Sequence, residues 1–117
     1  MERVLVVDDE VDALEILSWL LTDHGCDVRT ASDPRQAVSL GREFRPTLLI
    51  TDYLLSDAAT GLDVIRELRE QVDPALPAVL VTGMDPSLMR DELQALGNVE
   101  VLKKPFVWAD LCARLPF

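Results

Sequence analysis

Polar side chains that can do chemistry follow apolar stretches of strand length along this chain. They are Asp8, Asp9, Glu10, Asp52, Thr82 and Lys104. If the apolar stretches are parallel strands of one sheet, their carboxyl ends meet at one edge, and these side chains meet there too. Carboxylates gathered in one place repel one another unless a cation lies between them. Mg²⁺ suits a site with few carboxylates and several waters, so we expect a magnesium site at this edge.

The remaining side chains of the set match the needs of phosphoryl transfer. That chemistry requires positioning and charge neutralisation more than covalent help from the protein. A lysine supplies positive charge for the phosphoryl oxygens, and a threonine hydroxyl supplies a hydrogen-bond donor. An aspartate in such a site can act as the nucleophile and form an acyl phosphate.

The elements that must position these residues alternate along the chain. Apolar runs predict strands at residues 4–7, 26–30, 48–51, 78–82 and 99–102. Helical spacing and helix-capping residues predict helices at residues 11–24, 34–44, 61–71, 86–96 and 107–114. Several runs are apolar at consecutive positions, as is typical of parallel strands covered on both faces. This order predicts an α/β fold, a (βα)5 doubly wound parallel sheet with right-handed crossovers.

Local signals define several helix ends and faces. Asp33 and Asp85 each precede a proline and are predicted N-caps, and Asp63 is predicted to complete a capping box with Thr60. In the first helix we predict a core stripe, with Trp19 outside it and partly exposed. The stripe consists of Ala13, Ile16, Leu17, Leu20 and Leu21.

Composition limits the class of protein. The 117 residues fit one domain, residues 1–117, and the formal net charge is −10. Phosphate backbones and anionic membranes must be met by clustered Lys and Arg, and the sequence has no such cluster, so we expect neither partner. The sequence also lacks a signal-peptide pattern and an apolar run of about 18 residues, which predicts a cytoplasmic domain. Cys26 and Cys112 lack CxxC spacing, and we expect both to be unpaired.

Four short motifs together resemble the response-regulator receiver family of two-component signalling. They are VLVVDDE at the start, the apolar run ending in Asp52, VTG at Thr82 and KPF at Lys104. The resemblance covers essentially the whole chain. It implies a flavodoxin-like receiver architecture with strand order 2-1-3-4-5. It also implies a phosphoacceptor that is not an enzyme on other substrates, and that promotes only its own phosphorylation and dephosphorylation.

The resemblance also implies a role for each motif residue. Asp52 becomes the phosphoacceptor, Thr82 the switch hydroxyl and Lys104 the lysine that pairs with the phosphoryl group. The metal ligands for Mg²⁺ become Asp8, Asp9, Asp52 and the backbone carbonyl of Leu54. The Lys104–Pro105 peptide bond is expected to be cis.

The implied partner is a histidine kinase or a histidine phosphotransfer domain. Val11, Leu14 and Phe106 are expected to form an apolar docking patch beside the acidic site. Whether the domain is free-standing, fused to an output domain or part of a hybrid kinase stays open.

Two positions depart from the family pattern. The loop after Asp52, residues 53–61, lacks the usual proline and is one residue longer, and Asp57 within it is expected to be a turn residue. Val101 stands where family members often carry a Tyr or Phe that moves with the threonine, so that coupling cannot operate as such. The water-positioning sites two residues after Asp52 and Thr82 are the apolar Leu54 and Met84, which predicts slow self-dephosphorylation.

Three other functions fit the sequence less well. An aspartyl-nucleophile phosphatase of the haloacid-dehalogenase type wants a second Asp at position 54, which is Leu. A flavodoxin-like cofactor domain needs a phosphate loop where the acidic residues 8–10 would repel phosphate. A degenerate receiver, acting only as an interaction module, is disfavoured by the intact Asp52, Thr82 and Lys104.

Overall fold

The computed structural model describes residues 1–55 and 59–117. In chain order the elements are β1 Arg3–Val7, α1 Val11–Asp23, β2 Asp27–Ala31, α2 Pro34–Phe44, β3 Leu48–Asp52, α3 Gly61–Gln71, β4 Ala78–Thr82, the 3₁₀ helix η1 Pro86–Met89, α4 Arg90–Leu96, β5 Val99–Lys103 and α5 Trp108–Cys112. Asp57, predicted to be a turn residue, lies outside the described residues. In the described part of the chain, no helix is both long and apolar enough to cross a membrane.

The strands form a five-stranded parallel sheet in the order β2-β1-β3-β4-β5. This confirms the predicted fold class. Residues of β3 and β4 are buried along their whole length, because helices cover both faces of the sheet. All strands therefore end at the same edge.

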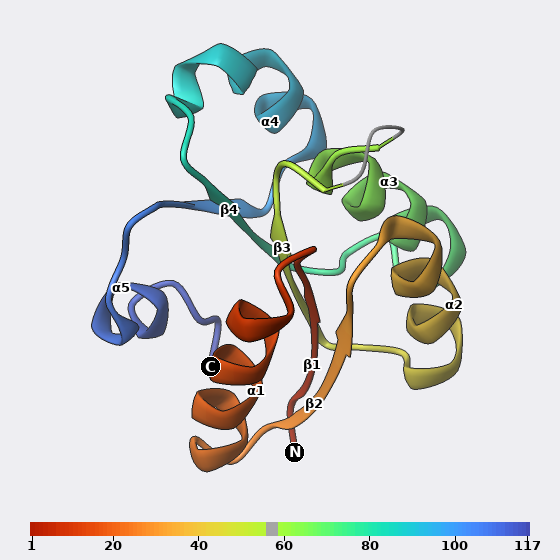
Figure 1. The fold of residues 1–117 in the computed structure, drawn as a ribbon. Helices are drawn as coiled ribbons and strands as arrows, with labels where there is room; N and C mark the ends of the chain where they lie inside the picture. The colour runs from red at the N-terminus through yellow and green to blue at the C-terminus, as the bar shows by residue number, and fades with distance from the viewer. Residues whose placement is uncertain (56–58) are drawn as a thin grey trace.

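The helices pack on opposite faces of the sheet, α1 and α5 on one and α2, α3 and α4 on the other (Figure 1). Alternate residues of β1 serve the two cores. Leu5 and Val7 pack with α2 and α3, whereas Val4 and Val6 pack with α1 and α5. The parallel pairing of β1 with β2 and β3 fixes its direction and hence the place where its acidic end emerges.

The predicted caps are present. The Asp33 carboxylate accepts a hydrogen bond from the Gln36 amide at 2.8 Å, and the Asp85 carboxylate accepts one from the Ser87 amide at 3.0 Å. Asp63 accepts from the Thr60 amide at 2.8 Å. Each cap fixes a loop that leads away from the carboxyl-terminal edge of the sheet.

Some boundaries differ from prediction. Strand β2 starts one residue late because the Cys26 amide donates to the Leu21 carbonyl at the end of α1. The helix predicted at 86–96 begins as the 3₁₀ turn η1, and the last helix ends at Cys112 rather than at 114. Cys26 and Cys112 are free thiols, as predicted.

The predicted facing of α1 is partly wrong. Leu14 is only 6% exposed and packs in the core with Leu21, whereas Ile16 is 59% exposed. Helix α1 carries apolar residues on most of its sides, so its periodicity alone does not decide which side meets the sheet. The predicted docking patch therefore loses Leu14. Trp19 is exposed, in line with its predicted position outside the core stripe.

Candidate functional site

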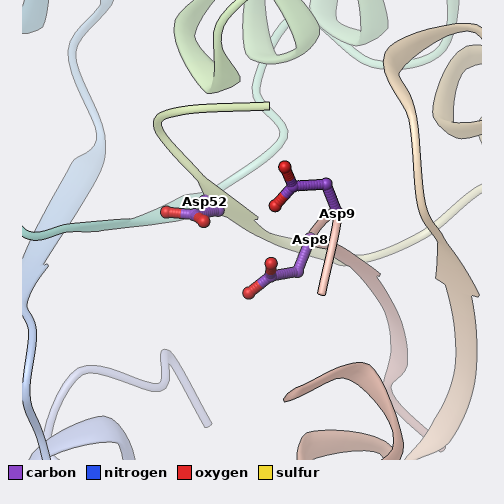
Figure 2. A group of neighbouring side chains, drawn as sticks. All are labelled: Asp8, Asp9 and Asp52. Atoms are coloured by element: carbon purple, nitrogen blue, oxygen red, sulfur yellow. The ribbon is translucent and has the colours of Figure 1, made fainter. Parts of the chain in front are cut away.

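The acidic site forms at the edge of the sheet where the neighbouring strands β1 and β3 end at the same level. Val7 at the end of β1 pairs with Thr51, and Asp52 at the end of β3 pairs with Val81. Asp8 and Asp9 continue from β1 and so reach the same edge as Asp52. Their carboxylates, with that of Asp52, gather at this edge (Figure 2). One oxygen from each of the three lies within 4.8 Å of the others.

Burial makes these carboxylates costly to ionise. Asp8 is 5% exposed and Asp52 is 9% exposed, while Asp9 faces solvent. Burial raises the pKa of Asp8, although the hydrogen bond from the Glu10 amide opposes this. Burial likewise raises the pKa of Asp52, and the hydrogen bond from Lys104 opposes it. The protein thus holds buried negative charge that favours a cation.

Lys104 reaches into this cluster from the end of β5. Its Nζ lies 3.2 Å from Asp52 Oδ2 and 3.9 Å from Asp8 Oδ2. Burial lowers the pKa of Lys104, but the hydrogen bond and charge of Asp52 outweigh it and leave that pKa above its ordinary value. The Lys104 amide donates to the Thr82 carbonyl at 2.8 Å, and the Lys104–Pro105 peptide is cis, as expected. The hydrogen bond to Thr82 holds the Lys104 backbone beside the end of β4, from where its side chain reaches Asp52.

Thr82 ends β4 and is 1% exposed. Its hydroxyl oxygen accepts a hydrogen bond from the Met84 amide at 3.0 Å. Because that bond uses a lone pair of the oxygen, the hydroxyl proton stays free to be donated to an anionic group. Thr82 is therefore arranged as a donor next to the strand end that carries Asp52.

The residues fit a hard divalent cation. All the side-chain donors are carboxylate oxygens, which Mg²⁺ prefers, and the exposed Asp9 leaves room for metal-bound water. Leu54 is held by an isolated antiparallel bridge to Thr60, and its role as a backbone ligand stays a prediction. The Glu10 amide donates a hydrogen bond to the Asp8 carboxylate at 2.9 Å.

Gly61 is a site residue that sequence reasoning did not single out. Its amide donates to the Tyr53 carbonyl at 2.8 Å, which brings the start of α3 against the phosphoacceptor strand. A Cβ at position 61 would overlap the Asp52 carbonyl oxygen. In the sequence, the only sign of this role is the glycine that follows Thr60 in the predicted capping box. The structure adds the reason why no larger residue fits, which is the close approach of the Asp52 backbone to position 61.

An apolar groove of about 320 Å³ runs from the acidic site between α1 and the start of α5. Asp8 and Asp52 line it where it meets the acidic site. Its sides are lined by Ala13, Ile16, Leu17, Leu20, Phe106 and Trp108. At the far end of α1, the His24 ring meets the Trp108 ring edge-on, with centroids 5.8 Å apart. Four of the five residues of the predicted core stripe of α1 therefore line this groove, and only Leu21 is fully buried.

Comparison with known proteins decides the family. The sequence model described as "Response regulator receiver domain" matches residues 4–116. The chain belongs to the response-regulator receiver family. The receiver is 36% identical over 114 residues to the probable transcriptional regulatory protein TcrX of Mycobacterium tuberculosis, covering 96% of this chain and 47% of that protein. It is 34% identical to the DNA-binding response regulator MtrA of Mycolicibacterium paratuberculosis, covering 97% of this chain and 49% of MtrA.

Solved structures agree with this assignment. The chemotaxis protein CheY4 of Vibrio cholerae superposes on the receiver with a TM-score of 0.88 at 29% identity, covering 97% of this chain and 94% of CheY4. The receiver spans about half the length of the curated relatives TcrX and MtrA. Since MtrA is named a DNA-binding regulator, the expected absence of a nucleic-acid partner finds no support among these relatives.

Proposed function

We propose that residues 1–117 act as one receiver domain that accepts a phosphoryl group on Asp52 from a histidine kinase or histidine phosphotransfer domain. The observation that carries this proposal is the position of Lys104 Nζ, 3.2 Å from the buried Asp52 within an acidic cluster. An Asp–Lys pair at a carboxylate-rich strand edge provides both a nucleophile and a countercharge.

Each residue has a defined part in the transfer. An Asp52 carboxylate oxygen attacks the phosphorus while the bond from phosphorus to the histidine nitrogen breaks, and its electron pair stays on the imidazole. Lys104 then exchanges its bond to Asp52 for one to a phosphoryl oxygen, and Thr82 donates its hydroxyl proton to another. Asp8, Asp9, Asp52 and the Leu54 carbonyl would hold Mg²⁺. The ion would neutralise charge on the carboxylates and the phosphoryl group.

The test is acyl-phosphate labelling by acetyl phosphate with Mg²⁺. Asp52→Asn should abolish label that is sensitive to hydroxylamine, because the amide is not a nucleophile. Asp23→Asn, which changes an exposed carboxylate at the end of α1, should label like wild type. Full labelling of Asp52→Asn would place the acceptor elsewhere. Absence of label in wild type would favour the alternative of a degenerate receiver that acts as an interaction module.

We further propose that the apolar groove beside Asp52 receives the histidine-bearing helix of the kinase partner. Of the predicted patch, the half-buried Phe106 lines the groove, whereas Val11 is exposed but lies outside it and Leu14 is buried. The exposed Ile16 lines the groove as well. The groove opens at Asp8 and Asp52, so a helix lying along it would present its histidine to the acceptor. The exposed apolar side chain of Ile16 is available to contact such a helix.

Ile16→Asp should therefore impair phosphotransfer from a kinase while leaving labelling by acetyl phosphate unchanged. The matched control is Leu88→Asp, an equally large change at a 71% exposed position on η1. Equal transfer to both variants would show that the kinase docks elsewhere. The cytoplasmic location and the restriction to self-phosphorylation and self-dephosphorylation stay predictions.

A further inference from the structure

Helix α4 is the element with the least apolar anchoring near the site. All its residues are described, and none of them is buried. Leu93 and Leu96 are half-buried against the core, and the buried Met89 lies just before the helix. A seven-residue helix after a 3₁₀ turn gains little from its own propensity. Its position must depend on contacts with neighbouring elements.

Arg69 of α3 supplies one such contact at the end of α4. Its guanidinium donates to the carbonyls of Leu96, Gly97 and Asn98 at 2.7, 2.8 and 3.1 Å. Its Nε donates to the Leu76 carbonyl at 3.0 Å, so one side chain ties α4 to the loop before β4. Carbonyls at a helix C-terminus lack partners within the helix and carry partial negative charge, which a planar cation with several donors satisfies.

Arg66, one helical turn earlier, contacts the first turn of α4. Its Nη2 lies 2.7 Å from Glu92 Oε2, and its Nη1 lies 3.0 Å from Asp63 Oδ1. The other oxygen of Asp63 accepts from the Thr60 amide at 2.8 Å. Thr60 is bridged to Leu54 in the loop that leaves Asp52. A continuous polar chain therefore runs from the phosphoacceptor loop through α3 to α4.

We propose that Arg66 and Arg69 act as a clamp that holds α4 from the α3 side, and that the chain Thr60–Asp63–Arg66–Glu92 couples α4 to the state of the phosphoacceptor loop. The second half rests on the proposed phosphorylation of Asp52. Val101 strengthens the case, because this short apolar side chain on β5 cannot hydrogen-bond to Thr82 or to a phosphoryl group. The hydrogen bonds and ion pairs of α3 provide a polar connection from the loop after Asp52 to α4, which the apolar Val101 cannot provide.

The clamp itself is tested in the unphosphorylated protein by hydrogen exchange of the α4 amides. Arg66→Gln removes two exposed ion pairs, of which the one to Glu92 reaches α4, and should speed exchange in residues 90–97 by about two- to fivefold. Arg69→Gln removes several charge-assisted hydrogen bonds and should speed it by at least about tenfold. Arg42→Gln is the control, since Arg42 links α3 to α2 through Gln71 and does not reach α4.

Unchanged α4 exchange in both clamp variants, or an equal increase in Arg42→Gln, would overturn the clamp. Arg66→Gln keeps the test decisive if Arg69→Gln folds poorly, because Arg66 is at the surface. These measurements need no phosphoryl group, so their outcome is independent of the proposed function.

The coupling is tested with beryllium fluoride and Mg²⁺ as a phosphoryl mimic, after acetyl-phosphate labelling has established that wild type and Arg66→Gln load equally. We expect the mimic to change α4 exchange in wild type and in Arg42→Gln, and to change it at least about twofold less in Arg66→Gln. An identical response in Arg66→Gln would refute the coupling while leaving phosphorylation of Asp52 intact. Loss of labelling in wild type would instead refute the proposed function.

Discussion

Replacing Asp9 by asparagine removes one charge from the acidic cluster with almost no change in size. Oxygens of Asp8, Asp9 and Asp52 lie within 4.8 Å of one another. Two like charges at that distance repel by about 0.9 kcal/mol in water, and Asp9 takes part in two such pairs, together about 1.7 kcal/mol. Salt screening reduces the gain to about 1 kcal/mol.

The metal-free Asp9→Asn protein should therefore unfold at a higher temperature than wild type, by about 3–5 °C for a domain of this size. Added Mg²⁺ should reverse the order, because the variant lacks a carboxylate ligand and gains less stability from binding. Thermal melts in EDTA and in Mg²⁺ measure both effects. Glu70→Gln is the matched control, since it removes the same charge from an exposed position on α3 outside the cluster.

A metal-free Asp9→Asn protein that melts below wild type would refute the reasoning about crowded carboxylates. The same would follow if Glu70→Gln raised the melting temperature equally, because the gain would then reflect the net charge of −10 rather than the cluster. Equal stabilisation of wild type and variant by Mg²⁺ would remove Asp9 from the ligand set.

Three further predictions concern Asp52, its loop and its neighbouring helix. Burial raises the pKa of Asp52, so its ionised form lowers the stability of the fold, and this loss is recovered as the pH falls through the folded pKa. Urea titrations of the metal-free proteins should therefore show that the excess free energy of unfolding of Asp52→Asn over wild type shrinks from about pH 7 to about pH 4. Growth of that excess at low pH would contradict the burial argument. Leu54→Asn should speed loss of acyl phosphate by about fivefold, the worth of one hydrogen bond to the attacking water; equal lifetimes in a time course would show that Leu54 does not gate it. Gly61→Ala should lower the free energy of unfolding by about 1–3 kcal/mol through overlap with the Asp52 carbonyl, whereas Gly83→Ala, with open space around it, should not.

The sequence alone predicted the parallel architecture and the membership of the acidic site. Runs of consecutive apolar residues predict strands covered on both faces, and residues that follow such strands must meet at one edge. The sequence pattern therefore suffices to place Asp8, Asp52 and Lys104 together. The caps at Asp33 and Asp85 were predictable for a related reason, since a cap is a contact between residues three or fewer positions apart.

Tertiary structure decided what local periodicity leaves open. Helix α1 is apolar on most sides, so only the sheet and the short α5 determine that Leu14 is buried and Ile16 faces the groove. The need for glycine at position 61 depends on a backbone nine residues earlier, and the contacts of Arg69 reach carbonyls up to 29 residues away. Such contacts exist only after the chain has folded, because spacing along the sequence does not encode which distant backbone groups a side chain will meet.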